Sequence, residues 1–72
     1  DADERRSLYE ATVAVLREAT ALAGRDPVVG AAEARLAVET IGSGRAVRTA
    51  VAAVAAADID CCCAIVGRSL SE

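Results

Sequence analysis

Three consecutive cysteines are the residues of this chain with the most distinctive chemistry. Cys61, Cys62 and Cys63 lie near the C-terminal end of a sequence that contains no histidine, methionine, tryptophan or phenylalanine. Thiolates bind Zn²⁺ and Cu(I), so a metal site is the first function to consider. Adjacent residues of a helix, however, point about 100° apart and cannot converge on one ion. We therefore predict no metal site and no cofactor, and thiol-based metal binding or redox chemistry at Cys61–Cys63 is the alternative hypothesis.

A catalytic role for these thiols has little support in the surrounding sequence. Asp58 and Asp60 would raise the pKa of a nearby thiol, and the chain offers no histidine as a general base. An odd number of cysteines excludes complete pairing within one chain and favours reduced thiols, with an intermolecular disulfide as a further option. Cysteine otherwise packs as a small apolar side chain. We expect mainly structural cysteines, with Cys61 buried on the side of Ile65 and Cys63 the most accessible.

Two further polar groupings do not make an active site. The segment 42–45, Gly-Ser-Gly-Arg, resembles part of a phosphate-binding loop but lacks the preceding strand, the full glycine pattern and the lysine. We expect a turn between helices there. Asp58, Asp60, Glu33 and Glu39 suggest paired carboxylates, but nothing in the sequence brings them into one pocket, and helix capping and solvation account for them. The chain is therefore not predicted to be an enzyme.

The composition limits the class of protein and of partner. The chain has 72 residues and a formal net charge of −3, and all eight of its basic residues are arginines. This balance argues against non-specific nucleic-acid binding, and one aromatic residue, Tyr9, is too few for base stacking. No apolar run approaches the ~20 residues of a membrane span, and no signal peptide is visible. We expect one acidic, cytoplasmic domain over residues 1–72, with residue usage typical of GC-rich bacterial coding.

An amphipathic helix is predicted over residues 3–23. Asp1 or Asp3 can cap it, and Gly24 suits the position after its last turn. Its expected core face spans about 120° of a helical wheel. The residues of that face are Leu8, Thr12, Val15, Leu16, Ala19, Leu22 and Ala23, with Tyr9 and Val13 on its flank.

The second predicted helix, residues 27–41, has two apolar faces. It begins at Asp26-Pro27, where aspartate caps and proline fits the first turn, and Gly30 weakens that turn by about 1 kcal/mol. One face comprises Ala31, Ala34, Val38 and Ile41, and the other comprises Val29, Ala32 and Leu36. Arg35 and Glu39 lie between them, spaced for a weak surface ion pair. Because two apolar faces are typical of a subunit contact, the candidate interface residues are Val29, Ala31, Ala34, Leu36, Val38 and Ile41.

Two more helices are predicted over residues 45–57 and 60–70, the first capped by Ser43. An unbroken helix would align a heptad seam of Val47, Val51, Val54, Asp58, Cys61 and Ile65. A break is favoured, because that seam would bury the Asp58 carboxylate without a partner.

The sequence therefore predicts an all-α fold, a small three- or four-helix bundle with close Ala-rich packing. A chain of this length buries only about 60% of its unfolded surface, so its stability is marginal and a partner subunit would help. The favoured function is protein–protein interaction, as an adaptor domain or a self-associating subunit that binds a protein and neither nucleic acid nor membrane. A weaker alternative is a helical precursor peptide with a modifiable tail of cysteine and serine.

Overall fold

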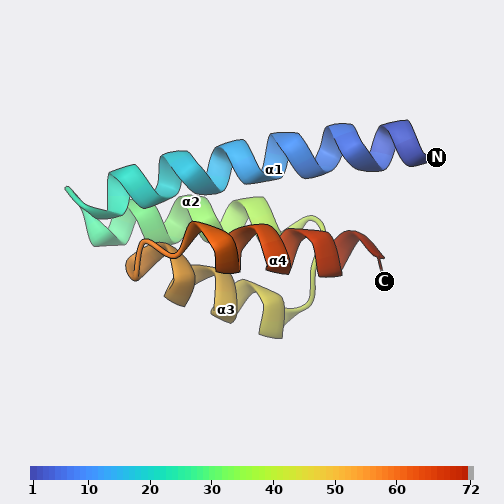
Figure 1. The fold of residues 1–72 in the computed structure, drawn as a ribbon. Coiled ribbons are helices and arrows are strands. Elements are labelled where there is room, and N and C mark those ends of the chain that lie inside the picture. Colours follow the sequence, from blue (N-terminus) through green and yellow to red (C-terminus); the bar gives the residue numbers. More distant parts are fainter. Residues whose placement is uncertain (72) are drawn as a thin grey trace.

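Four α-helices make up residues 1–71, the part of the chain that the computed structural model describes (Figure 1). They are α1 (Ala2–Ala23), α2 (Pro27–Glu39), α3 (Gly44–Ala55) and α4 (Ile59–Ser71). These residues contain no strand, so the predicted all-α class is confirmed. Every predicted helix is present, with ends within two residues of the expected positions.

A side-chain cap precedes every helix. The carboxylates of Asp1, Asp26 and Asp58 accept hydrogen bonds of 3.0–3.4 Å from backbone N–H groups in the first turns of α1, α2 and α4. The hydroxyl of Ser43 accepts one of 3.3 Å from the first turn of α3. These bonds satisfy N–H groups that have no partner within the helix. The position at which each helix begins is therefore determined by residues close to it in the sequence.

The helical conformation is interrupted between α3 and α4 at Ala57, whose φ of 56° lies in the left-handed region. The N–H of Ala57 donates to the carbonyl of Val54 at 3.1 Å, and the N–H of Asp58 donates to the carbonyl of Ala53 at 2.9 Å. This pair of bonds is a Schellman motif, which ends a helix. The carboxylate of Asp58 then accepts a bond from the N–H of Cys61. The predicted break is confirmed, and Asp58 is an exposed cap rather than a buried member of a seam.

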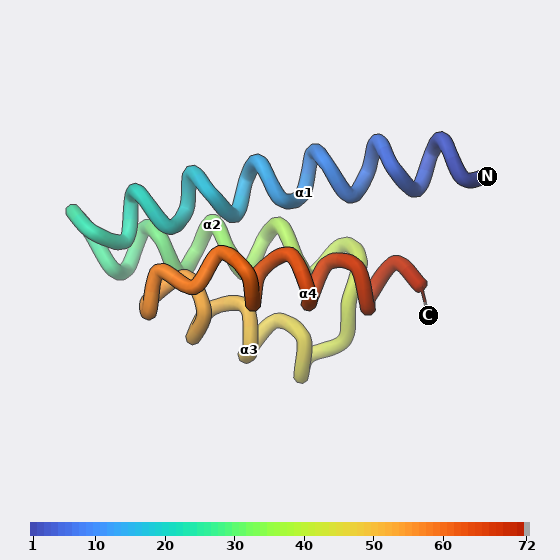
Figure 2. The backbone as a smooth tube through the Cα atoms, viewed as in Figure 1, coloured from blue at the N-terminus to red at the C-terminus, as the bar shows by residue number. Residues whose placement is uncertain are grey.

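The helices pack as two layers of two. α1 and α2 form an antiparallel hairpin, and α3 and α4 lie against it, so that α2 adjoins both α1 and α3 while α4 adjoins α1 and α3 (Figure 2). α1 has 22 residues against 12 or 13 in the others, and its first turns extend past its neighbours. Neither α1 nor any other described helix is long and apolar enough to cross a lipid bilayer.

The core between the helices consists of small and medium-sized side chains. Its buried members are Val13, Leu16, Ala19, Ala34, Val38, Val47, Ala50, Ala53, Val54, Cys62, Ile65 and Val66. Four of these are alanines, in line with the predicted Ala-rich packing. Small residues bring the helix backbones close together, and each contributes little apolar area, so the core is thin.

The core face of α1 is rotated from its predicted position. Val13, expected on the flank, is only 7% exposed, whereas Leu8, expected in the core, is 44% exposed. Val15 and Leu22 are half-buried. The reason is that α1 packs against both α2 and α4. The face that points between those two helices is centred near Leu16, and Leu8 lies at its edge on the overhanging part of α1.

Candidate docking face

One of the three cysteines is buried, and it is Cys62. Its side chain is 1% exposed, whereas Cys61 and Cys63 are half-buried. The expectation of one buried thiol is confirmed, but its assignment to Cys61 is wrong. That assignment extended the helical wheel of Val54 across the break between α3 and α4. Because the break resets the phase, α4 turns Cys62 and Val66 toward the core instead.

The cysteines do not form a ligand cluster. Within residues 1–71, no group of three histidine, cysteine, aspartate or glutamate side chains is placed to hold a metal ion. Burial raises the pKa of the Cys62 thiol, and Cys61, Cys63 and Asp58 raise it further. A thiol with a raised pKa stays protonated and is a poor nucleophile at neutral pH. Cys63 adjoins Tyr9 across the α1–α4 contact, where its side chain raises the pKa of the tyrosine.

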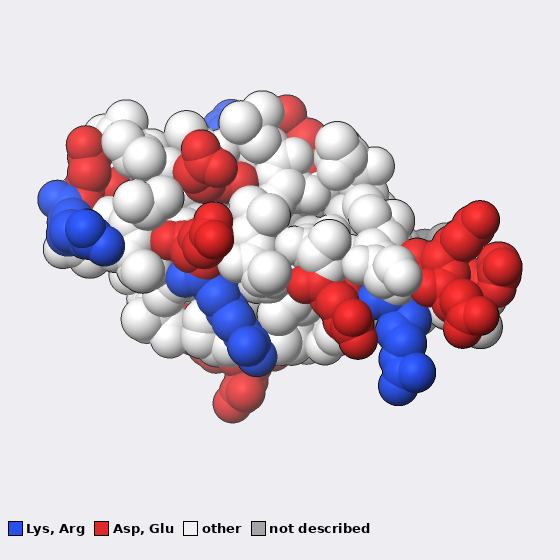
Figure 3. Space-filling view, turned by 90° about the horizontal axis from the view of Figure 1, so that it is seen from above, with Lys and Arg blue, Asp and Glu red and all other residues white. Residues whose placement is uncertain are grey.

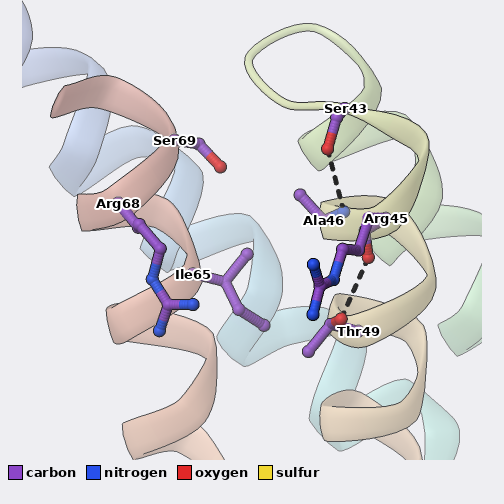
Figure 4. Close-up of a pocket in the computed structure, with 7 residues that line it drawn as sticks. All are labelled: Ser43, Arg45, Ala46, Thr49, Ile65, Arg68 and Ser69. Atoms are coloured by element: carbon purple, nitrogen blue, oxygen red, sulfur yellow. Dashed lines mark hydrogen bonds between the residues drawn. The ribbon is translucent and has the colours of Figure 1, made fainter. Parts of the chain in front are cut away.

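A cationic hollow of about 220 Å³ lies between the start of α3 and the end of α4 (Figure 4). Arg45 and Arg68 flank it from the two helices, and the hydroxyls of Ser43, Thr49 and Ser69 line it. The Ser43 hydroxyl caps α3, and the Thr49 hydroxyl donates to the carbonyl of Arg45 at 2.9 Å. The predicted turn at 42–45 therefore forms one wall of this hollow. Of these hydroxyls, that of Thr49 already donates its hydrogen to the helix backbone, whereas that of Ser43 acts as an acceptor.

The outer face of α2 carries the most exposed apolar surface of the described chain. Val28 is 77% exposed, Leu36 62% and Val29 40%, and Ala32 between them is also exposed. Their spacing places all four on one side of the helix, within about 100° on a wheel. We call these four residues the outer face of α2. The opposite side of the same helix lies in the core, so folding does not require this face.

The six predicted interface residues divide between these two sides of α2. Ala34 and Val38 are fully buried inside the bundle, and Ala31 and Ile41 are half-buried at its edge. The first predicted apolar face is therefore core. The neighbours of α2, which are α1 and α3, cover this face, so it is not left to a partner. Of the six residues, Val29 and Leu36 remain exposed.

Val28 belongs to the outer face of α2 but is not among the six predicted interface residues. The signal was present in the sequence, because Val28, Ala32 and Leu36 recur at intervals of four residues. Residues at that spacing stack along one side of a helix.

Charged residues frame the outer face of α2. Arg25 lies in the turn before α2, Arg35 lies within the helix next to Leu36, and Glu39 is its last residue; all three are exposed. The predicted pair of Arg35 and Glu39 is not formed: within residues 1–71 the one ion pair is that of Arg6 with Glu10 on α1, at 4.0 Å. Seen from the side of α1, acidic side chains gather at the end of the molecule that holds the N terminus, and much of the central surface is uncharged (Figure 3). The charges that border α2 are therefore available to a partner.

Comparison with known proteins gives no match: no protein-family model, no curated protein and no solved structure is similar to the chain.

Proposed function

We propose that this protein is a small, non-catalytic helical module that acts by docking a protein on the outer face of α2. The observation that carries the proposal is the position of the exposed apolar side chains. Of the four large hydrophobic residues exposed in residues 1–71, three lie on this one face. Val28 and Leu36 stand almost free of the bundle while the other side of their helix is buried.

Solvent exposure of these side chains costs free energy that a partner would recover. Complete burial of a valine or leucine side chain is worth roughly 1.5–3 kcal/mol. Single exposed apolar residues are common on protein surfaces, but several on one helix face, framed by charges, are typical of an interaction site. Regular helical structure also presents these residues in a fixed arrangement, which lowers the entropy lost on binding.

A thiol-based function has weaker support from the same structure. Cys62 is held in the core with a raised pKa, and Cys61 and Cys63 flank it on α4 rather than converging with it. The outer face of α2, in contrast, lies outside the core, which Ala34 and Val38 on the opposite side of the helix join.

Site-specific photo-crosslinking in cells of the natural host tests the proposal. The photoreactive residue p-benzoylphenylalanine replaces Val28 or Leu36 in the full chain, and it replaces Glu10 in a control. Glu10 is a suitable control because its side chain is 71% exposed but lies on α1. We expect discrete covalent adducts from positions 28 and 36 and none of the same mass from position 10. Equal adducts from all three positions, or no adduct from 28 and 36, would contradict the proposal.

A further inference from the structure

The cationic hollow between the start of α3 and the end of α4 is separate from the outer face of α2. None of the residues that line it belongs to α2. We infer that this hollow binds the phosphate group of a small molecule, either inorganic phosphate or a small phosphate monoester. The inference goes beyond the proposed function and does not depend on it, because its tests leave Val28 and Leu36 unchanged.

Two arginines from different helices meet at this hollow. Arg45 belongs to α3 and Arg68 to α4, and in Figure 4 their guanidinium groups lie on either side of Ile65. Neither arginine has an ion pair within 4.0 Å inside residues 1–71, and no carboxylate is among the residues that line the hollow. Like charges at one site repel each other. An anion bound between the two helices would replace this repulsion by attraction to both guanidinium groups.

The sequence around the hollow concentrates positive charge in a chain whose net charge is −3. Residues 40–57 contain no aspartate or glutamate, and α3 is the only one of the four described helices without an acidic residue. Arg45 lies in the first turn of α3, where the helix dipole opposes a cation and favours an anion. The charge of Arg45 therefore works against the stability of α3, but it would add to the attraction of an anion at this helix start.

Two hydroxyls beside the arginines have hydrogens to donate. The Ser43 hydroxyl accepts a bond of 3.3 Å from the N–H of Ala46, which leaves its own hydrogen for a ligand. Ser69 lines the hollow from α4, and Figure 4 marks no hydrogen bond between its hydroxyl and the other residues drawn. A planar carboxylate is satisfied by one bidentate arginine, whereas a tetrahedral phosphate presents oxygens in several directions. Donors on two helices therefore favour phosphate over carboxylate.

The size of the hollow limits the ligand. Its volume of about 220 Å³ is below the roughly 300–1,000 Å³ that is typical of pockets for drug-sized molecules. Ile65, which is 5% exposed, contributes an apolar surface. Tyr9 is the one aromatic residue of the chain and is not among the lining residues, so the hollow offers no aromatic ring to a nucleobase. These limits suit a phosphate ion or a small monoester better than a nucleotide.

Binding should be weak and sensitive to salt. Arg45 and Arg68 are both exposed, and water and ions screen exposed charges. We therefore expect a dissociation constant of roughly 0.3–10 mM for inorganic phosphate at low ionic strength. Arg45→Gln and Arg68→Gln should each raise this constant about 3–10-fold, because each removes charge-assisted hydrogen bonds to the anion.

A nuclear magnetic resonance titration of the isotope-labelled 72-residue chain with inorganic phosphate tests the inference. Sodium chloride keeps the ionic strength constant, and acetate is the comparison anion. We expect saturable shifts confined to the N–H signals of residues 43–46 and 65–69 and to the side-chain Nε–H signals of Arg45 and Arg68. Methyl phosphate is titrated in parallel. Binding of both compounds would identify a monoester site, and binding of inorganic phosphate alone would restrict the ligand to the free ion.

Arg25→Gln is the matched control. It removes the same charge from an exposed arginine in the turn between α1 and α2, at the far end of the bundle from the hollow (Figure 1). It should change the dissociation constant less than about two-fold, since a distant exposed charge is screened. The dispersion of the spectra establishes that each variant is folded. Equal losses of affinity in all three variants, equal shifts with acetate and phosphate, or shifts that do not saturate would each show non-specific attraction of anions and overturn the inference.

Discussion

Gly30 of α2 lies directly against Ala23 of α1. A Cβ atom added to Gly30 would lie 2.5 Å from the Cβ of Ala23 and 2.8 Å from the carbonyl oxygen of Ala19. Real Cβ atoms do not approach so closely, so any larger residue at position 30 would push the two helices apart. This glycine reduces the local helix propensity of α2, but it permits the close packing of the hairpin.

Gly30→Ala should therefore destabilise the protein although alanine favours helix. The gain in propensity is about 1 kcal/mol, whereas forcing a methyl group into a full contact with backbone costs typically 1–3 kcal/mol and here lies at the upper end. We expect a net loss of about 1–2 kcal/mol in urea unfolding. Gly44→Ala is the matched control, because its nearest neighbour would be an Arg48 nitrogen at 3.8 Å. A Gly30→Ala protein as stable as the control would show that the hairpin can relax.

Ala57→Gly should stabilise the protein. Ala57 occupies the left-handed position of the Schellman motif with φ of 56°, a conformation that glycine adopts without the Cβ penalty. We expect a gain of about 1 kcal/mol, measured as a higher midpoint of thermal unfolding. Ala56→Gly is the control, because Ala56 has φ of −87° and gains nothing from glycine. Equal effects of the two substitutions would contradict the assignment of the break to Ala57.

The three thiols should differ in reactivity in the native state. Cys62 is buried and should react slowly with a thiol reagent, whereas Cys61 and Cys63 should react first. Mass spectrometry of partially labelled, digested protein measures the order. Cys62→Ala should cost about 1–2 kcal/mol through the cavity it leaves, more than Cys61→Ala at its half-buried position. Fast labelling of Cys62 would show that α4 opens readily from the bundle.

Alkaline pH should weaken the fold through Cys62. Its folded pKa is raised above the ordinary 9.0, first by burial, so the folded state holds this proton more tightly than the unfolded chain does. The stabilisation is complete below the ordinary pKa and is lost as the pH rises through the folded pKa. The stability difference between the unaltered chain and Cys62→Ala should therefore shrink above about pH 9. Urea unfolding of both proteins over a pH series measures it, and a constant difference would contradict it.

Arg45→Glu should stabilise α3. Arg45 lies in the first turn, where the helix dipole disfavours positive charge, and Arg68 flanks the same hollow. Replacing the cation by an anion should add about 0.3–1 kcal/mol at low ionic strength and less in high salt. Thermal unfolding at two salt concentrations provides the measurement. Arg48→Glu is a control with the same change of charge one turn further into the helix, and a similar gain there would point to net charge as the cause.

The local elements of this protein are determined by its sequence. The helix starts can be predicted without any knowledge of the fold, because each capping side chain bonds to N–H groups of residues that closely follow it. The capping residues are Asp26, which precedes Pro27, Ser43 and Asp58. The same holds for the two apolar faces of α2, and Val29 and Leu36 were recognisable as surface candidates for that reason. A capping bond spans two or three residues, and its geometry depends on nothing more distant.

Only the tertiary structure decided which face of each helix is buried. Val13 replaced Leu8 in the core of α1 because two neighbours, α2 and α4, set the direction of burial. Cys62 replaced Cys61 because one left-handed residue reset the phase of α4. Burial depends on the positions of the neighbouring helices, and those positions follow from the packing of all four helices together. The periodicity of one helix carries no information about where its neighbours lie.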